Sequence, residues 1–202
     1  REHTLATLSR RDYPQAYSLA DFDRAIRTTA EELEDLQKRV EEKLSDAASL
    51  IFASHLLILK DHAFVGEMRK RIEKGNKPPL AILEVTRQYI EIFDRSESPY
   101  IREKVQDVED LIVRLIDNLL QKAGPAEGFG HRVVIARELF PSDLLRMSSE
   151  EVAGAVLVAG GVTSHLSILA RSLQIPMVIA NSPELMKLAD GTPILLDADT
   201  GN

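Results

Sequence analysis

The residues best suited to chemistry lie together between Gly160 and Pro176, in the sequence GGVTSHLSILARSLQIP. Two glycines follow an apolar run, and a threonine, a serine and a histidine come next. Glycines let the backbone turn sharply and let a bulky group approach closely. Thr163 is placed to cap a helix whose first turn contains His165. We therefore predict that any catalysis by this chain centres on His165.

A histidine in the first turn of a helix lies beside unpaired backbone N–H groups and the positive end of the helix dipole. Both attract an anion and disfavour the imidazolium form. A neutral imidazole beside an anion site suits a phosphoryl acceptor, because its nitrogen keeps the lone pair that attacks phosphorus, while hydroxyls of Thr163, Ser164 or Ser167 stabilise the transferred group. The same residues allow a plainer interpretation, in which Thr163 only caps a helix packed on a sheet and Arg171 complements its C-terminus.

The elements around this stretch alternate between short strands and helices. The pattern predicts strands at 132–136, 154–159, 176–180 and 193–197, with helices at 141–147, 163–173 and 183–188. Ser148 with Glu151 forms a capping-box pattern. Such alternation is typical of an α/β layered domain. We assign residues 125–202 to this domain and residues 1–20 to an N-terminal remnant of it.

Residues 21–124 differ, because their apolar side chains recur at the three- and four-residue spacings of amphipathic helices. The spacings predict helices at 21–44, 47–60, 64–74, 80–93 and 99–122, with a bend after Lys60. The helix at 47–60 is apolar on nearly all sides, so we interpret its His55 as a core histidine rather than a catalytic one. A Gly- and Pro-rich linker at 124–130 ends this helical subdomain.

The composition of the chain excludes several classes of function. The chain of 202 residues has no cysteine and a formal net charge of −7. It therefore lacks disulfides and thiolate metal ligands, and an acidic chain is a poor partner for nucleic acid. No segment has the roughly 20 apolar residues that a membrane span requires. These features predict a cytoplasmic protein with no membrane span, no nucleic-acid partner and no metal site of its own.

The stretch resembles the phosphohistidine signature of the phosphoenolpyruvate-utilising enzymes. The matching residues are Gly160, Gly161, Val162, Thr163, Ser164, His165, Ala170, Arg171, Ile175 and Pro176. The resemblance implies a mobile, swivelling α/β domain that carries a phosphoryl group on His165. It further implies that Gly161, Thr163, Ser164 and Arg171 bind the phosphate.

The helical half resembles enzyme I of the bacterial phosphotransferase system. The matching residues are Ile51, Phe52, Ser54, His55, Leu59 and Asp61, and later Tyr100, Arg102, Glu103, Asp107, Asp110 and Arg114. This resemblance implies an all-α helical-bundle subdomain, inserted in the swivelling domain, that docks the phosphocarrier HPr or a protein like it. On the same basis we expect Asp61 and Lys104 to contact the carrier.

The resemblance places the phosphoenolpyruvate site and its Mg²⁺ in a C-terminal barrel that residues 1–202 do not form. We therefore expect a phosphoenolpyruvate-protein phosphotransferase whose present segment has no cofactor and cannot use phosphoenolpyruvate alone.

Three features depart from enzyme I. The glycine-rich first strand is missing, Phe140 stands where a threonine is usual before Pro141 and Ser142, and the acidic cluster near Asp61 is sparse. Two alternatives stay open. One is the swivelling domain of a dikinase or phosphoenolpyruvate synthase, which shares the histidine but not the helical subdomain. The other is a regulatory module that binds a carrier without catalysis, which the departures at Phe140 and near Asp61 favour.

Overall fold

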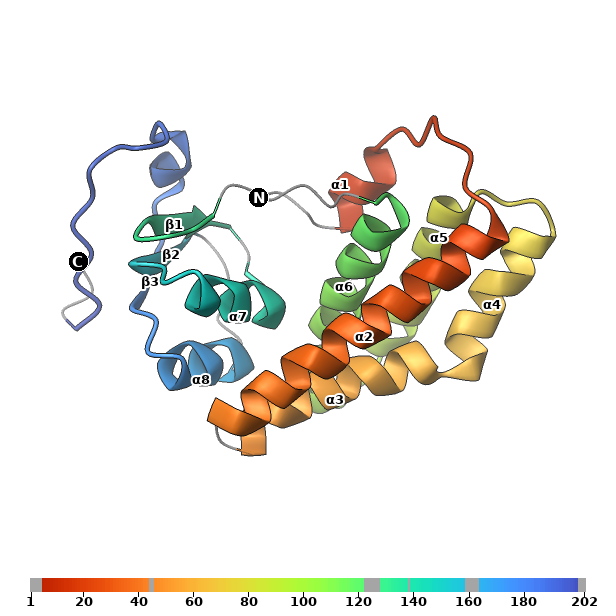
Figure 1. Cartoon of the computed structure of the whole chain (residues 1–202), viewed down its shortest axis with the longest axis horizontal. Helices are drawn as coiled ribbons and strands as arrows, with labels where there is room; N and C mark the ends of the chain where they lie inside the picture. The colour runs from red at the N-terminus through yellow and green to blue at the C-terminus, as the bar shows by residue number, and fades with distance from the viewer. Residues whose placement is uncertain (1–4, 44–45, 122–127, 138, 159–163, 200–202) are drawn as a thin grey trace. The chain divides into compact units, whose positions relative to one another are not determined.

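The structure of the protein, a computed structural model, describes residues 5–43, 46–121, 128–137, 139–158 and 164–199. It divides the chain into two compact units, one formed by His3–Gly124 and the other mainly by Pro125–Asn202. The first is a bundle of helices and the second contains a small parallel sheet with helices (Figure 1). The predicted fold class, an α/β domain joined to an all-helical subdomain, is confirmed.

Apart from the first, which the sequence did not predict, the described helices of the helical unit follow the predicted periodicity closely. They are α1 (Leu5–Arg10), α2 (Leu19–Lys43), α3 (Asp46–Lys60), α4 (His62–Glu73), α5 (Pro78–Asp94) and α6 (Pro99–Leu119). Helix α2 packs along α3 and against α6, while α5 packs on α4 and α6 (Figure 1). The predicted bend after Lys60 is the start of a separate helix, α4.

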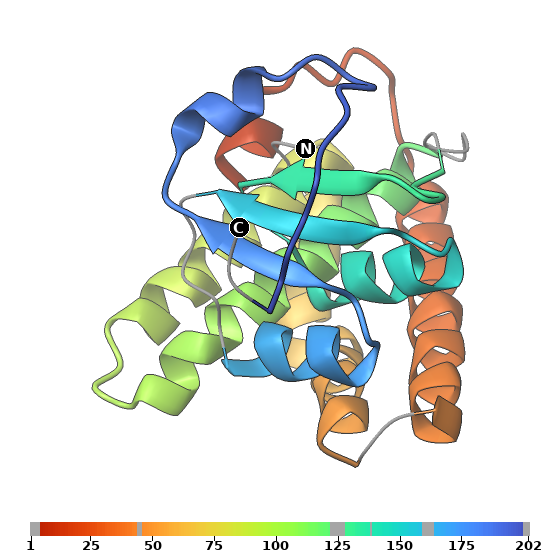
Figure 2. The ribbon, with the colours of Figure 1, turned by 90° about the vertical axis from the view of Figure 1, so that its left-hand side faces the viewer.

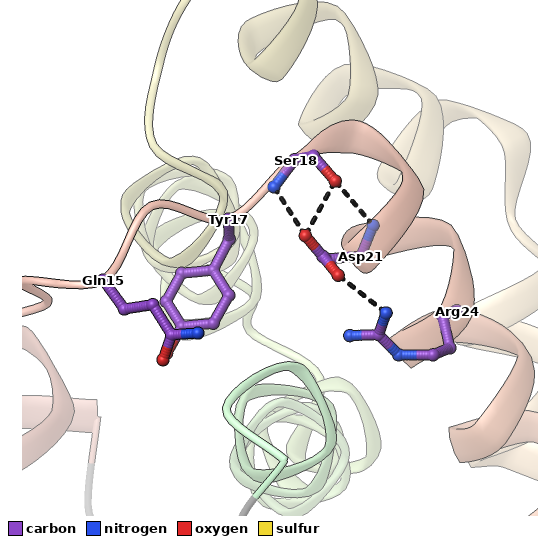
Figure 3. A network of polar contacts seen from close by, with 5 residues as sticks. All are labelled: Gln15, Tyr17, Ser18, Asp21 and Arg24. Atoms are coloured by element: carbon purple, nitrogen blue, oxygen red, sulfur yellow. Dashed lines mark hydrogen bonds and ion pairs between the residues drawn. The ribbon is translucent and has the colours of Figure 1, made fainter.

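The start of α2 is fixed by a reciprocal capping arrangement at Ser18 and Asp21 (Figure 3). The Ser18 hydroxyl accepts the Asp21 N–H at 3.2 Å, and the Asp21 carboxylate accepts the Ser18 N–H at 2.8 Å and the Ser18 hydroxyl at 2.7 Å. Arg24 donates to the other carboxylate oxygen at 2.6 Å. These bonds, led by that from the Ser18 backbone, lower the pKa of Asp21 from 3.8 to about 2.

Residues near the N-terminus belong to the helical unit, which corrects the prediction that 1–20 extend the α/β domain. Helix α1 packs against α5 and α6. Leu8 and Tyr13 are buried in the helical core, and the Tyr13 hydroxyl donates to the Leu8 carbonyl at 2.8 Å. Burial of these two side chains in the core of the helical bundle places this segment in the helical unit.

The α/β unit is built on three parallel strands. Its elements are β1 (Val133–Ala136), α7 (Pro141–Ser149), β2 (Gly154–Val158), α8 (Ser164–Ser172), β3 (Met177–Ala180) and the 3₁₀ helix η1 (Pro183–Lys187). The order is β1-β2-β3, with Ile135 paired to Val156 and Val156 to Val178 (Figure 2). Every residue of β2 is buried, as expected for the central strand of a parallel sheet.

Two local predictions in this unit are wrong. Residues 193–197 run without strand pairing, although Leu196 packs so closely on Gly154 that a Cβ there would clash with the leucine side chain. Leu196 is therefore the residue of this segment that contacts the sheet, whereas Ile194 and Leu195 are exposed. Ser148 does not begin a helix, because it lies inside α7.

Candidate phosphoryl-transfer site

The sheet and one crossover helix position the predicted catalytic histidine. Strand β2 ends at Val158, and α8 begins at Ser164 and leads into β3, which is parallel to β2. The start of α8 therefore follows the carboxyl end of the central strand. In open parallel sheets this edge is where ligands bind, in the space outside the strand ends.

His165 is the second residue of α8 and lies in its first turn. The first N–H groups of a helix have no partner within the helix, and they carry partial positive charge. The backbone at His165 therefore has the anion-attracting position that the sequence predicts. Ser164, another predicted phosphate ligand, is the first residue of the same helix, whereas Gly161 and Thr163 lie outside the described residues.

Helix α8 is anchored by buried apolar side chains and by its packing against a neighbouring helix. Leu166, Leu169 and Ala170 are buried, and α8 packs against α7. At its C-terminal end the Ile175 N–H donates to the Ala170 carbonyl at 2.9 Å, which closes the last turn. These contacts fix the helix axis relative to α7.

Arg171, the fourth predicted phosphate ligand, lies at the other end of α8. It is exposed in the last turn, six positions after His165. At a rise of 1.5 Å per residue the two Cα atoms are separated by about 9 Å along the helix axis. The backbone therefore places Arg171 where its charge complements the helix C-terminus, and only its long side chain could extend toward a phosphate.

Phe140 occupies the position where the family resemblance led us to expect a threonine. It is the residue before α7, its side chain is only 7% exposed, and its N–H donates to the Asp143 carboxylate at 3.1 Å. The Asp143 carboxylate therefore caps the start of α7, which the sequence analysis missed. Proline at 141 followed by an acidic residue at 143 is the signal that could have revealed it.

Asp61, a predicted carrier contact, has a structural role in the chain itself. Its carboxylate accepts the N–H groups of Ala63 and Phe64 at 2.7 and 3.0 Å, so it caps the start of α4. The residue is exposed, so the cap lies at the surface.

Lys104, the other predicted carrier contact, is already engaged within the helical unit. Its ammonium donates to the Ser54 hydroxyl at 3.1 Å and to the Asp107 carboxylate at 2.8 Å. About a quarter of its side chain is exposed. Lys104 contacts Ser54 on α3, and Asp61 directly follows α3, seven positions after Ser54. Lys104 and Asp61 therefore lie next to α3 at points about two turns apart.

His55 is a core residue, as predicted. Its side chain is buried, and its Nε2 atom lies 3.7 Å from a carboxylate oxygen of Asp110 on α6, which is also buried. Sequence reasoning identified the histidine but missed this partner.

Neither a metal cluster nor a membrane span is found in the part of the chain that the structure describes. There, no three His, Asp or Glu side chains gather in a way that could hold an ion. None of the helices in these ranges is long and apolar enough to cross a bilayer.

Comparison with known families matches both units. Residues 5–104 match the family described as PEP-utilising enzyme, N-terminal, and residues 130–201 match PEP-utilising enzyme, mobile domain. The second match contains the whole of α8, including His165.

Curated relatives are named phosphoenolpyruvate-protein phosphotransferase. That of Bacillus subtilis is 28% identical over 184 residues, covering 90% of this chain and 32% of the relative. That of Streptococcus equinus is 30% identical over 186 residues, with 90% and 32% covered. The chain thus spans about a third of the length of these relatives.

Solved structures share the fold. A solution structure of an Enzyme I protein aligns with a TM-score of 0.70 and 27% identity, covering 98% of this chain and 78% of that one. The N-terminal domain of Enzyme 1 - Nitrogen aligns with a TM-score of 0.65 and 24% identity over 85% of this chain and 73% of that one. The chain belongs to the PEP-utilising enzyme family and has the fold of the N-terminal domain of enzyme I.

Proposed function

We propose that this chain is the phosphoryl-transfer segment of a phosphoenolpyruvate-protein phosphotransferase, with His165 as the residue that carries the phosphate. The observation that carries the proposal is the place of His165 in the first turn of α8, after the carboxyl end of the buried strand β2. The family match over residues 130–201 and the names of the relatives support it.

The proposed reaction has two transfers. In the first, the lone pair of a neutral imidazole nitrogen of His165 forms an N–P bond while the bond from phosphorus to the donor oxygen breaks, and the electron pair leaves with the donor. In the second, a nucleophile of the carrier forms a bond to phosphorus as the N–P bond breaks. The phosphoryl oxygens stay negative throughout, so the first N–H groups of α8 favour the phosphorylated state.

Gly161, Thr163 and Ser164 are proposed to complete the phosphate site at the start of α8. Arg171 is proposed as a ligand that reaches the phosphate only through its extended side chain. Because Phe140 has no hydroxyl, we propose that a group other than residue 140 orients the His165 ring.

The helical unit is proposed to dock an HPr-like phosphocarrier, with Asp61 and Lys104 at its contact surface. Asp61 is exposed, and Lys104 offers part of its side chain. The donor phosphoenolpyruvate and its Mg²⁺ are proposed to bind in a domain outside residues 1–202, and the protein is proposed to act in the cytoplasm.

The central experiment follows phosphate on individual histidines. The chain is incubated with phosphorylated HPr, and acid-labile phosphate is mapped by mass spectrometry under neutral conditions. We expect label on His165, and loss of all label in His165→Ala. His131→Asn is the matched control, because His131 is an exposed histidine of the same unit with φ +53°, which asparagine tolerates. Label that persists in His165→Ala would refute the assignment.

Two further arms separate the alternatives. Incubation with phosphoenolpyruvate and Mg²⁺ alone is expected to leave His165 unlabelled, and labelling would refute the proposal that the donor site lies elsewhere. A dikinase domain would neither bind nor exchange with HPr, and a regulatory module would bind HPr without exchange. The helical unit, with its family match over residues 5–104, favours the phosphotransferase over the dikinase.

A further inference from the structure

A row of polar side chains runs along one side of α6, next to an apolar stripe on the same helix. Its members stand at spacings of three or four residues, so they share one face. They are Lys104, Asp107, Asp110, Arg114 and Asn118. We call them the polar row of α6. The apolar stripe contains Val108, Leu111, Ile112, Leu115, Ile116 and Leu119, all buried.

Each end of the polar row contacts a different helix. Lys104 donates to Ser54, and Asp110 approaches His55, both on α3. Farther along, Arg114 donates to Glu32 of α2 at 2.9 Å. Asn118 donates to Thr29 at 3.0 Å and to Glu32 at 3.1 Å. The α2–α3 pair therefore meets α6 through at least four polar contacts in register.

The centre of the row is deeply buried. His55 is 0% exposed and Asp110 is 3% exposed. A buried ionisable pair contributes little net stability, because the loss of hydration offsets the attraction between the groups. Its geometry is nevertheless demanding, since a slipped helix would leave a buried polar group against an apolar surface. Apolar side chains, by contrast, can repack one position along the helix with only a small loss of stability.

We propose that the polar row of α6, with His55 and Asp110 at its centre, sets the register of α3 and α2 on α6. It selects one of several packings that the apolar side chains alone would tolerate. His55 and Asp110 are positioning residues in this scheme. Because Asp61 follows α3 and Lys104 lies on α6, the register also fixes their separation, a consequence for carrier docking that rests on the proposed function.

The test replaces the central pair by apolar residues and measures register directly. The chain has no cysteine, so Leu57→Cys on α3 and Gln106→Cys on α6, both exposed positions, accept two nitroxide labels without further changes. Double electron–electron resonance then measures the distance between the two labels in the labelled parent and in the double variant His55→Leu with Asp110→Leu. Thermal unfolding is recorded on the same samples.

We expect the parent to give one narrow distance distribution. The double variant is expected to unfold within a few degrees of the parent or above it, yet to give a broader distribution or a second population. His55→Leu alone is expected to unfold at a lower temperature than the double variant, because it leaves the Asp110 carboxylate buried without the histidine.

The matched control is the pair Lys60→Leu with Glu34→Leu. These side chains also join α3 to α2, at 3.3 Å, but they are largely exposed. Their replacement is expected to leave the distance distribution unchanged. A single narrow distribution in the His55 and Asp110 double variant would overturn the proposal. So would failure of that variant to fold, because the pair would then supply stability rather than register. Neither outcome bears on phosphate transfer by His165.

Discussion

Single residues in this chain often have two roles that the sequence alone does not separate. Asp61 is a predicted carrier contact, and the structure shows that it caps α4. A substitution at Asp61 will therefore weaken the helix as well as any docking, so loss of binding in such a variant needs a stability measurement beside it. Lys104 calls for the same precaution, because Ser54 and Asp107 hold its ammonium.

Asp21 supplies a pH-dependent part of stability. Its pKa falls from 3.8 to about 2 on folding, chiefly through the Ser18 N–H bond. A carboxyl with a lowered folded pKa stabilises the fold fully above its unfolded pKa, and this contribution disappears as the pH falls from about 4 to about 2. Asp21→Asn should therefore unfold at a lower temperature than the parent at neutral pH, with the difference shrinking across this acid range.

Thermal unfolding of both proteins at several pH values measures this difference. Ser149 is exposed at the surface of the other unit, and Ser149→Ala serves as a control whose offset from the parent should not change with pH. A difference between Asp21→Asn and the parent that stays constant down to the lowest pH would show that the charge of Asp21 does not matter.

At the scale of elements, helix ends depend on backbone conformations that some residues adopt at a cost. Gly75 follows α4 with φ +97°, and no atom lies within 4 Å of where its Cβ would be. Gln174 follows α8 with φ +55°. Both residues close their helices with the same pattern, since the next N–H, of Asn76 or Ile175, reaches back to a carbonyl five residues earlier.

These two positions should respond to substitution with opposite signs. Gly75→Ala is expected to destabilise by about 1 kcal/mol, because a Cβ disfavours the left-handed region. Gln174→Gly is expected to stabilise by up to about 1 kcal/mol, because it removes that strain while adding some unfolded-state entropy. Urea unfolding of each variant measures the change in the free energy of unfolding. Equal signs would mean that side-chain contacts, rather than backbone conformation, decide stability at these helix ends.

The sequence predicted an element well where the spacing of its apolar residues matched its buried face. It predicted an element poorly where the burial depends on residues far away in the sequence. The stripes of α2, α5 and α6 and the apolar run of β2 marked their elements, because each buried face repeats at its own period. Helix α1 and the turn after it were not predicted, because Leu8 and Tyr13 are buried in a core built from helices distant in the sequence. The segment 193–197 was misread because Leu196 packs on the sheet without pairing to it.

The helix that carries the candidate histidine was predicted from sequence, but the contacts of neighbouring elements were not. The sequence predicts a strand at 154–159, a turn at Gly160 and a helix at 163–173, and α8 begins within one residue of the expected start. Partners from other elements were not predictable, because nothing local to His55 or Phe140 specifies Asp110 or the packing of α7 on α8. Arg171 shows the same limit, since its motif position suggested a ligand while the helix places its backbone about 9 Å along the axis from His165.

At the scale of the whole molecule, each unit has its own hydrophobic core. Leu115 is buried in the helical unit, among side chains of α1, α2, α4, α5 and α6. Leu157 is buried on the central strand of the α/β unit. Units with separate cores can open separately, with free energies set by their own contacts.

Core truncations should therefore act locally. Leu157→Ala and Leu115→Ala are each expected to destabilise by about 2–5 kcal/mol, because each leaves a cavity in a well-packed core. In hydrogen exchange measured by mass spectrometry on the intact chain, Leu157→Ala should speed exchange in peptides from 128–199 and leave those from 5–121 unchanged. Leu115→Ala should do the reverse. If either variant accelerated exchange equally in both units, the two units would unfold as one cooperative block, and the expectation that the α/β unit moves as a separate domain would lose its thermodynamic basis.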